Sequence, residues 1–116
     1  SRGLGDVYKR QAKNSCSGLI FALREESAFR QEIFLVIISL SVIIITEVSA
    51  IEIIFMTFAT SLVLIIELLN SSVEAAVDRI SFEYHGLSKR AKDYGSAAVM
   101  LSLFLWTLIH GLVLFN

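Results

Sequence analysis

Three long apolar runs constrain the fold of this chain more than any other feature of its sequence. They extend from residue 33 to about 48, from 50 to about 69 and from 97 to 115, and the chain contains no proline. At about 1.5 Å per residue, an apolar helix of roughly 20 residues crosses the roughly 30 Å hydrocarbon core of a bilayer. Together with a mean hydropathy of +0.71, the runs predict an all-α membrane protein with three transmembrane helices.

The basic residues predict how these helices are oriented. All 10 Lys and Arg precede the first apolar run or lie between the second and the third. Because Lys and Arg concentrate on the cytoplasmic side of membrane proteins, we expect the N-terminus and the 78–95 segment in the cytoplasm and the C-terminus outside. The single cysteine, Cys16, then lies in a reducing compartment and has no partner for an internal disulfide.

The segments around the apolar runs differ in character. Residues 1–11, SRGLGDVYKRQ, lack an initiator Met and resemble a translated sequencing-adapter remnant, so we assign them no function. From about residue 12 to 28, apolar residues recur at helical spacing among polar ones, which predicts an amphipathic surface helix in the membrane interface.

The charged stretch EESAFRQE (25–32) joins this surface helix to the first span. The predicted spans cover about 30–48, 50–80 and 95–115, and turn chemistry before the third comes from Gly86, Ser88, Gly95 and Ser96.

The second span carries acidic residues where a membrane helix rarely has them. Glu67, Asn70, Glu74 and Asp78 follow one another at intervals of three or four residues, so they form one polar stripe on a helix with about 100° per residue. The stripe rises about 10 Å from Glu67 to Glu74 and so crosses from the apolar core to the lipid headgroups. Because a carboxylate inside a bilayer costs roughly 3 kcal/mol on insertion scales, Glu67 requires a structural or functional reason.

Two interpretations of this stripe are open from the residues alone. In the first, the stripe hydrogen-bonds between helices of a homo-oligomer, or lines a pore, in a non-catalytic small membrane subunit. In the second, Glu67 is the general base for a lipid hydroxyl. Glu74 then holds Mg²⁺, which prefers oxygen ligands, with a second carboxylate from the pair Glu25 and Glu26. Lys92 and Asp93 on the same side of the membrane favour the second. No glycine-rich phosphate loop, zinc motif or GxSxG elbow occurs, so any nucleotide site is built from side chains on helices.

Four segments give the chain a specific family resemblance: ESAFRQE (26–32), ELLNSSVEAAVDRI (67–80), SFEYHGLSKRAKD (81–93) and GSAAV (95–99). With these segments, the chain from residue 12 to 116 resembles the prokaryotic integral-membrane diacylglycerol kinases. The resemblance implies a homotrimer in the bacterial inner membrane, with three spans and a surface helix in each protomer and the C-terminus in the periplasm. It also implies transfer of the γ-phosphate of Mg-ATP to the hydroxyl of diacylglycerol, which gives phosphatidate.

The resemblance also implies roles for individual residues. Glu67 matches the proton acceptor, Glu26 and Glu74 match the metal and nucleotide ligands, and Asn70 and Ser96 match positions near the reacting lipid. The other implied nucleotide-binding residues are Glu83, Tyr84, His85, Lys92 and Asp93.

Departures from the family pattern concentrate in the amino-terminal helix. The family usually has an Arg near the position of Val7, and a Tyr and a Trp in the region of Asn14 and Cys16. The case for nucleotide contacts from this helix is therefore weak. The resemblance assigns no role to Asp78, which we expect to do no more than pair with a nearby base such as Arg79 or Lys92.

The closest alternative within the same fold is an undecaprenol kinase of the Gram-positive type. The segments VDRI (77–80) and KDYGSAAV (92–99) are closer to the diacylglycerol enzymes. We therefore predict diacylglycerol as the substrate.

Overall fold

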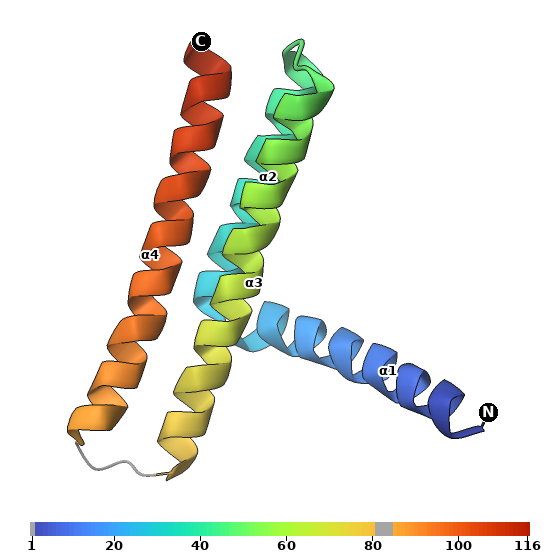
Figure 1. The fold of residues 1–116 in the computed structure, drawn as a ribbon, viewed down its shortest axis with the longest axis vertical. Coiled ribbons are helices and arrows are strands. Elements are labelled where there is room, and N and C mark those ends of the chain that lie inside the picture. The colour runs from blue at the N-terminus through green and yellow to red at the C-terminus, as the bar shows by residue number, and fades with distance from the viewer. Residues whose placement is uncertain (1, 81–84) are drawn as a thin grey trace.

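Four α-helices make up the fold in a computed structural model, which describes residues 2–80 and 85–116. They are α1 (Arg2–Glu25), α2 (Ser27–Ile45), α3 (Ala50–Ile80) and α4 (Gly86–Phe115). Figure 1 shows α2, α3 and α4 as an upright bundle, from which α1 projects sideways near one end. Each upright helix is long and apolar enough to cross a membrane, which confirms the prediction of an all-α chain with three potential spans.

Helix α1 is almost entirely exposed. Among its described side chains, Ala22 is the buried one, with 5% of its surface accessible. Residues 2–11, which the sequence analysis sets aside, continue into the rest of the helix without interruption. Cys16 is a free, exposed thiol.

The corner between α1 and α2 is a single residue, Glu26. Its backbone is extended, with φ −102° and ψ 105°. The Arg30 guanidinium stabilises the break, because it donates to the carbonyl oxygens of Leu23 at 3.3 Å and Arg24 at 2.8 Å, which are among the unpaired groups of a helix end. The chain therefore turns here without Gly or Pro.

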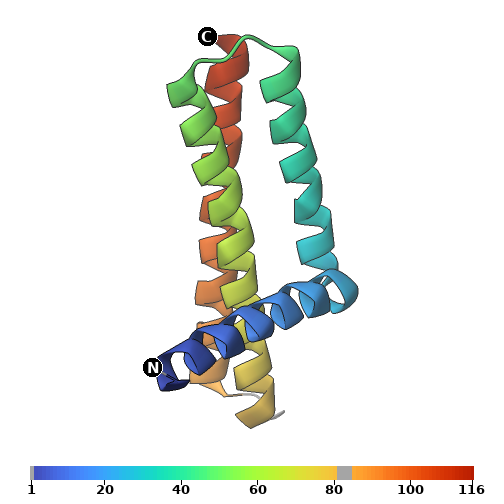
Figure 2. The ribbon, with the colours of Figure 1, turned by 90° about the vertical axis from the view of Figure 1, so that its right-hand side faces the viewer.

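At the opposite end of the bundle, residues 46–49 connect α2 to α3 (Figure 2). Helix α2 ends at Thr46, whose backbone is extended, with φ −105° and ψ 153°. The Thr46 N–H and hydroxyl both donate to the Val42 carbonyl oxygen, at 3.0 and 2.5 Å. Ser49 and Glu52 form a capping box: the Glu52 N–H donates to the Ser49 hydroxyl at 3.2 Å and the Ser49 N–H donates to the Glu52 carboxylate at 2.9 Å. Figure 2 shows the C-terminus at this same end.

Helix α4 begins earlier in the chain than the turn residues suggested. His85 caps it, because its Nδ1 accepts the Leu87 N–H at 3.1 Å. The following residues are helical despite the weak helix propensity of Gly and Ser. The predicted turn residues inside the helix are Gly86, Ser88, Gly95 and Ser96.

The apolar core of the bundle is small. Helices α3 and α4 form its most extensive interface, whereas α2 packs mainly on α3 and touches α4 sparsely. In the most apolar window of each upright helix, at most 28% of the residues are buried. Most of the apolar surface therefore lies outside the core of the protomer. Its central cluster consists of Ala59, Val63 and Trp106, with Leu35, Leu103 and Ile109 partly buried against them. Phe29, Val42 and Met56 are buried as well.

Candidate active site

A pocket of about 480 Å³ opens among α2, α3 and α4 near the α1 end of the bundle. We call it the acidic pocket, because four carboxylates line it. The structure brings together five residues that the sequence analysis selected, Glu26, Glu67, Asn70, Glu74 and Ser96. The remaining lining residues are Ser27, Ala28, Glu32, Val99, Met100 and Leu103.

Burial along the α3 stripe decreases from Glu67 to Glu74. Glu67 is 5% exposed and Asn70 is 8% exposed, whereas Glu74 is open to solvent. The Asn70 amide donates a long hydrogen bond of 3.4 Å to Glu74 Oε1. The stripe thus leads from a covered carboxylate, suited to a reacting group, to an open carboxylate, suited to a soluble ligand.

Glu32 belongs to this pocket, and the sequence analysis missed it. Its side chain is 8% exposed and lies close enough to Glu67 for the two carboxylates to repel each other. Its Oε2 atom has no hydrogen-bond partner among the described residues. The signal in the sequence was its place as the last charged residue before the first apolar run.

The acidic pocket has a surplus of hydrogen-bond acceptors and of negative charge. The carboxylates of Glu74 and Glu26 both repel Glu67, and neither Lys nor Arg appears among the described lining residues. The Oδ1 atom of Asn70 is buried and, within the described parts of the chain, unpartnered. Such a pocket is suited to a cation and to a hydroxyl donor.

A divalent metal fits the donor set of this pocket. Among the described residues, no group of three or more His, Cys, Asp or Glu side chains is placed so that it could hold a metal ion by itself. Mg²⁺, however, is commonly held by one or two carboxylates together with substrate phosphates. Glu26 and Glu74 line the same pocket and supply two carboxylates.

Two of the predicted nucleotide ligands are paired at the start of α4, outside the acidic pocket. The Lys92 ammonium lies 2.7 Å from Asp78 Oδ1 on α3, which confirms the predicted pairing of Asp78 with a nearby base. Asp93 pairs with Lys89 at 2.5 Å along the same helix. Both pairs are solvent-exposed.

Of the predicted nucleotide ligands Glu83, Tyr84 and His85, the structure describes His85. His85 caps α4 and is exposed. Glu83 and Tyr84 lie outside the described residues.

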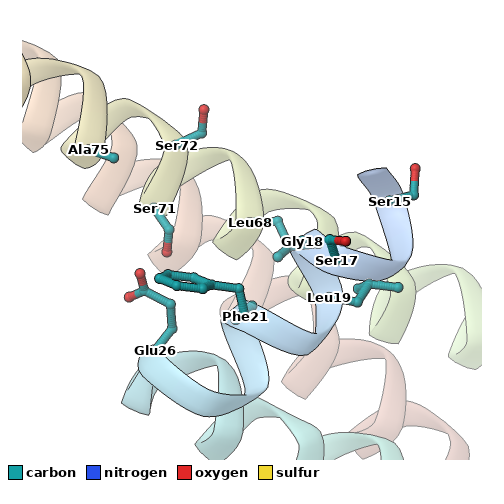
Figure 3. Close-up of a pocket in the computed structure, with 11 residues that line it drawn as sticks. Ser15, Ser17, Gly18, Leu19, Phe21, Glu26, Leu68, Ser71, Ser72 and Ala75 are labelled. Carbon is teal, nitrogen blue, oxygen red and sulfur yellow. The ribbon is translucent and has the colours of Figure 1, made fainter. Parts of the chain in front are cut away.

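A larger and mostly apolar pocket of about 810 Å³ lies between α1 and α3. Leu19 of α1 and Leu68 of α3 contribute apolar walls. Figure 3 shows the Phe21 ring reaching from α1 toward Ser71 of α3, with the Glu26 side chain beside it. Because Glu26 lines both pockets, the apolar space adjoins the acidic one.

These features define a small helical protein with three potential membrane spans and an acidic pocket beside an apolar one. Residues 13–114 match the model of the family described as prokaryotic diacylglycerol kinase. The chain is 46% identical over 103 residues to a diacylglycerol kinase of Haemophilus influenzae, an overlap of 89% of this chain and 87% of the relative. A diacylglycerol kinase of Pseudomonas aeruginosa is 44% identical over 100 residues, 86% of this chain and 81% of the relative. One of Escherichia coli K12 is 45% identical over 94 residues, 81% and 77% of the two chains.

The chain therefore belongs to the prokaryotic diacylglycerol kinase family. Family membership confirms the prediction of a transmembrane, ATP-dependent diacylglycerol kinase. It also implies that the reaction involves ATP and a divalent metal.

Proposed function

We propose that this chain transfers the γ-phosphate of Mg-ATP to the hydroxyl of diacylglycerol and forms phosphatidate at the cytoplasmic face of the membrane. The observation that carries the proposal is the position of Glu67, a carboxylate 5% exposed in an acidic pocket that adjoins an apolar one. A lipid alcohol brings a polar hydroxyl and apolar chains to the same place. The two adjoining pockets offer a surface for each.

In this proposal Glu67 accepts the proton of the lipid hydroxyl. A positioned general base contributes typically about 10²- to 10⁴-fold to the rate. The hydroxyl donates its single hydrogen to Glu67. The buried acceptors of Asn70 and Glu32, which have no partner among the described residues, then accept from water that enters the pocket with the lipid. Ser96 of α4 lines the same pocket and positions the lipid from the opposite side.

Glu26 and Glu74 hold the divalent ion, Mg²⁺, together with the phosphates of ATP. When bound, the ion neutralises the charge on the phosphoryl group that is transferred. Lys92 provides a point charge for phosphate, and it lies on α4 close to the open end of the α3 stripe, where Asp78 holds it. The further residues proposed to contact the nucleotide are Glu83, Tyr84, His85 and Asp93.

The proposed assembly is a homotrimer in the bacterial inner membrane. Because at most 28% of the residues in each apolar window are buried within the protomer, lipid and neighbouring copies together have to cover the rest. The basic residues favour a cytoplasmic N-terminus and a periplasmic C-terminus. Helix α1, which exposes Leu19, Ile20 and Phe21, then lies in the interface as an amphipathic surface helix. The proposed native domain is 12–116, without residues 1–11.

A direct assay tests the function and its closest alternative together. Purified protein in mixed micelles receives Mg-ATP with diacylglycerol and undecaprenol side by side, and labelled phosphate is followed into each lipid. We expect phosphatidate as the main product. Preferential labelling of undecaprenol would assign the alternative substrate, and no transfer to either lipid would favour a non-catalytic membrane subunit.

The metal site is tested in the same assay with Glu74→Gln. We expect this variant to lose most turnover at ordinary Mg²⁺ concentrations, because one of the two proposed metal ligands loses its charge. Size-exclusion chromatography should show an unchanged oligomer. Full activity of Glu74→Gln would remove Glu74 from the metal site.

A further inference from the structure

A second group of polar side chains lies deeper in the bundle, and the proposed function does not use it. We call it the polar layer. Its members are between 3% and 9% exposed, and they are Ser39, Thr60, Trp106 and His110. The layer includes one residue on α2, one on α3 and two on α4. A histidine buried at membrane depth needs a named partner and a reason.

Each residue of the polar layer is seven positions from a residue of the acidic pocket. Seven residues leave only about 20° between two side chains on a helix and separate them by about 10 Å along its axis. The polar layer therefore continues the inward faces of the same three helices at greater depth. The four pairs are Glu32 with Ser39, Glu67 with Thr60, Val99 with Trp106, and Leu103 with His110.

The polar atoms of this layer are joined in one chain of hydrogen bonds. The His110 Nδ1 atom lies 2.8 Å from the Trp106 carbonyl oxygen, which can only accept, so Nδ1 carries the hydrogen. The other nitrogen, Nε2, then accepts from the Ser39 hydroxyl at 2.9 Å. The Trp106 indole N–H donates to Thr60 Oγ1 at 2.9 Å, and Thr60 donates to the Met56 carbonyl oxygen at 2.8 Å. The chain runs from α2 through α4 to α3.

Helix α2 depends on this layer more than its neighbours do. From residue 33 to its end, α2 has only two polar side chains, Ser39 and Ser41. Lipid is as apolar as the rest of this helix, so apolar burial does little to fix its rotation. Among the described residues, Ser39–His110 is the one side-chain hydrogen bond from α2 to the other upright helices. In contrast, α3 and α4 share an extensive interface and two side-chain bonds.

We infer that the hydrogen bond between Ser39 and His110 is a membrane-buried positioning device, which sets the rotation of α2 and thereby directs Glu32 into the acidic pocket. Because Ser39 and Glu32 share one face of α2, a rotation that breaks the bond also turns the Glu32 carboxylate away from Glu67. Ser39 and His110 act through α2 and contact neither substrate. The catalytic consequence of this inference rests on the proposed function, whereas the structural part does not.

The rotation of α2 is measurable without an activity assay. In a Cys16→Ser background, spin labels at Ile38→Cys and Phe58→Cys report the distance between α2 and α3 from two exposed positions, and an excess of unlabelled protomers suppresses distances between copies. Ser39→Ala should shift or broaden the distance distribution. The matched control is Ser41→Ala, since the Ser41 hydroxyl bonds within its own helix, to the Ile37 carbonyl oxygen at 2.8 Å. It should leave the distribution unchanged.

Kinetics then separate positioning from general stability. Ser39→Ala and His110→Leu should lower kcat for diacylglycerol by up to about 10-fold, because both act through the placement of Glu32. The KM for ATP should change little. His110→Gln, whose amide replaces Nε2 as a partner for Ser39, should recover part of kcat. Trp106→Phe, which removes the indole hydrogen bond to Thr60 on α3 and keeps an aromatic ring beside His110, should lower the unfolding temperature and largely retain kcat.

The outcomes distinguish the inference from the proposed function. An unchanged distance distribution in Ser39→Ala would overturn the inference, as would kcat values that fall equally in Ser39→Ala and Trp106→Phe. If the distances shift as expected but the parent chain does not phosphorylate diacylglycerol, the proposed function fails and the structural role of the Ser39–His110 bond stands.

Discussion

The acidic pocket and the polar layer lie about 10 Å apart along the same three helices, yet they differ in whether their buried polar atoms have hydrogen-bond partners. In the polar layer, the hydroxyls of Ser39 and Thr60 and the His110 ring all have partners within the protomer. In the acidic pocket, Glu32 Oε2 and Asn70 Oδ1 are buried without a partner among the described residues. A buried polar group without a partner costs roughly 1–3 kcal/mol, so such groups mark a place where a ligand completes the hydrogen bonding. The polar side chains of the polar layer already have their hydrogen-bond partners, so we assign them a structural role instead.

The largest effect is expected from Glu67→Gln, which tests whether the acidic pocket is catalytic and the polar layer structural. The substitution keeps the shape of the side chain but removes the proposed base, so kcat should fall at least about 100-fold. The matched variant is Thr60→Val, seven residues away on the same face of α3, which should lower stability and retain most activity. Phosphate transfer to diacylglycerol and thermal unfolding are measured for both. Equal losses of activity would mean that the polar layer is part of the site.

Glu32→Gln should have the next largest effect and should separate activity from stability. Glu32 and Glu67 repel each other in the pocket, so removing one charge relieves the repulsion and spares a buried carboxylate. The unfolding temperature should stay the same or rise, while kcat falls about 10-fold because a hydrogen-bond acceptor beside Glu67 is weakened. If the unfolding temperature and kcat both fall, Glu32 has a structural partner, as the residues of the polar layer do.

The sequence sufficed for those parts of the fold that depend on one helix at a time. Hydropathy predicted the three helices that are long and apolar enough to cross a membrane, and the spacing from Glu67 to Glu74 predicted that these residues share one face of α3. Features that depend on two helices were not predictable in this way. Glu26 ends α1 because Arg30 reaches back to its last carbonyls, and Glu32 is recognisable as part of the site only when α2 is placed beside α3. The periodicity of one helix does not determine which of its residues face which residues of the neighbouring helix.

The start of α4 shows the same limit. Gly95 and Ser96 have turn chemistry in the sequence, yet both are helical. The approach of α4 to Asn70 on α3 gives Gly95 a packing role that no local pattern reveals. Similarly, the pairing of Ser39 with His110 spans 71 residues of sequence and requires the assembled bundle.

Gly95→Ala tests how closely α4 must approach the acidic pocket. A Cβ atom at Gly95 would lie 3.2 Å from Asn70 Cγ and overlap its Oδ1, so Asn70 has to move from its place in the pocket. We expect a loss of activity of about 5- to 10-fold, since displaced positioning groups slow the reaction. The control is Gly111→Ala on the same helix, where a Cβ meets nothing within 4 Å. It should retain activity and stabilise the helix by at most about 1 kcal/mol. If both variants lose activity equally, the contact with Asn70 is not the cause.

The smallest effect is expected from the ion pair of Lys92 and Asp78, whose polar groups are partnered like those of the polar layer but exposed to solvent. The two side chains are 42% and 53% exposed, so each can exchange its partner for water or for a phosphate at little cost. Asp78→Asn should therefore leave the unfolding temperature almost unchanged and should not raise the KM for ATP, because the Lys92 ammonium becomes available. Lys92→Ala should raise that KM several-fold, and Lys89→Ala, which removes an exposed cation one turn away, should not. Equal increases from both lysine variants would point to general electrostatic steering of the nucleotide. A specific increase from Lys92→Ala would place an exchangeable pair at the open end of the stripe that begins with the buried Glu67.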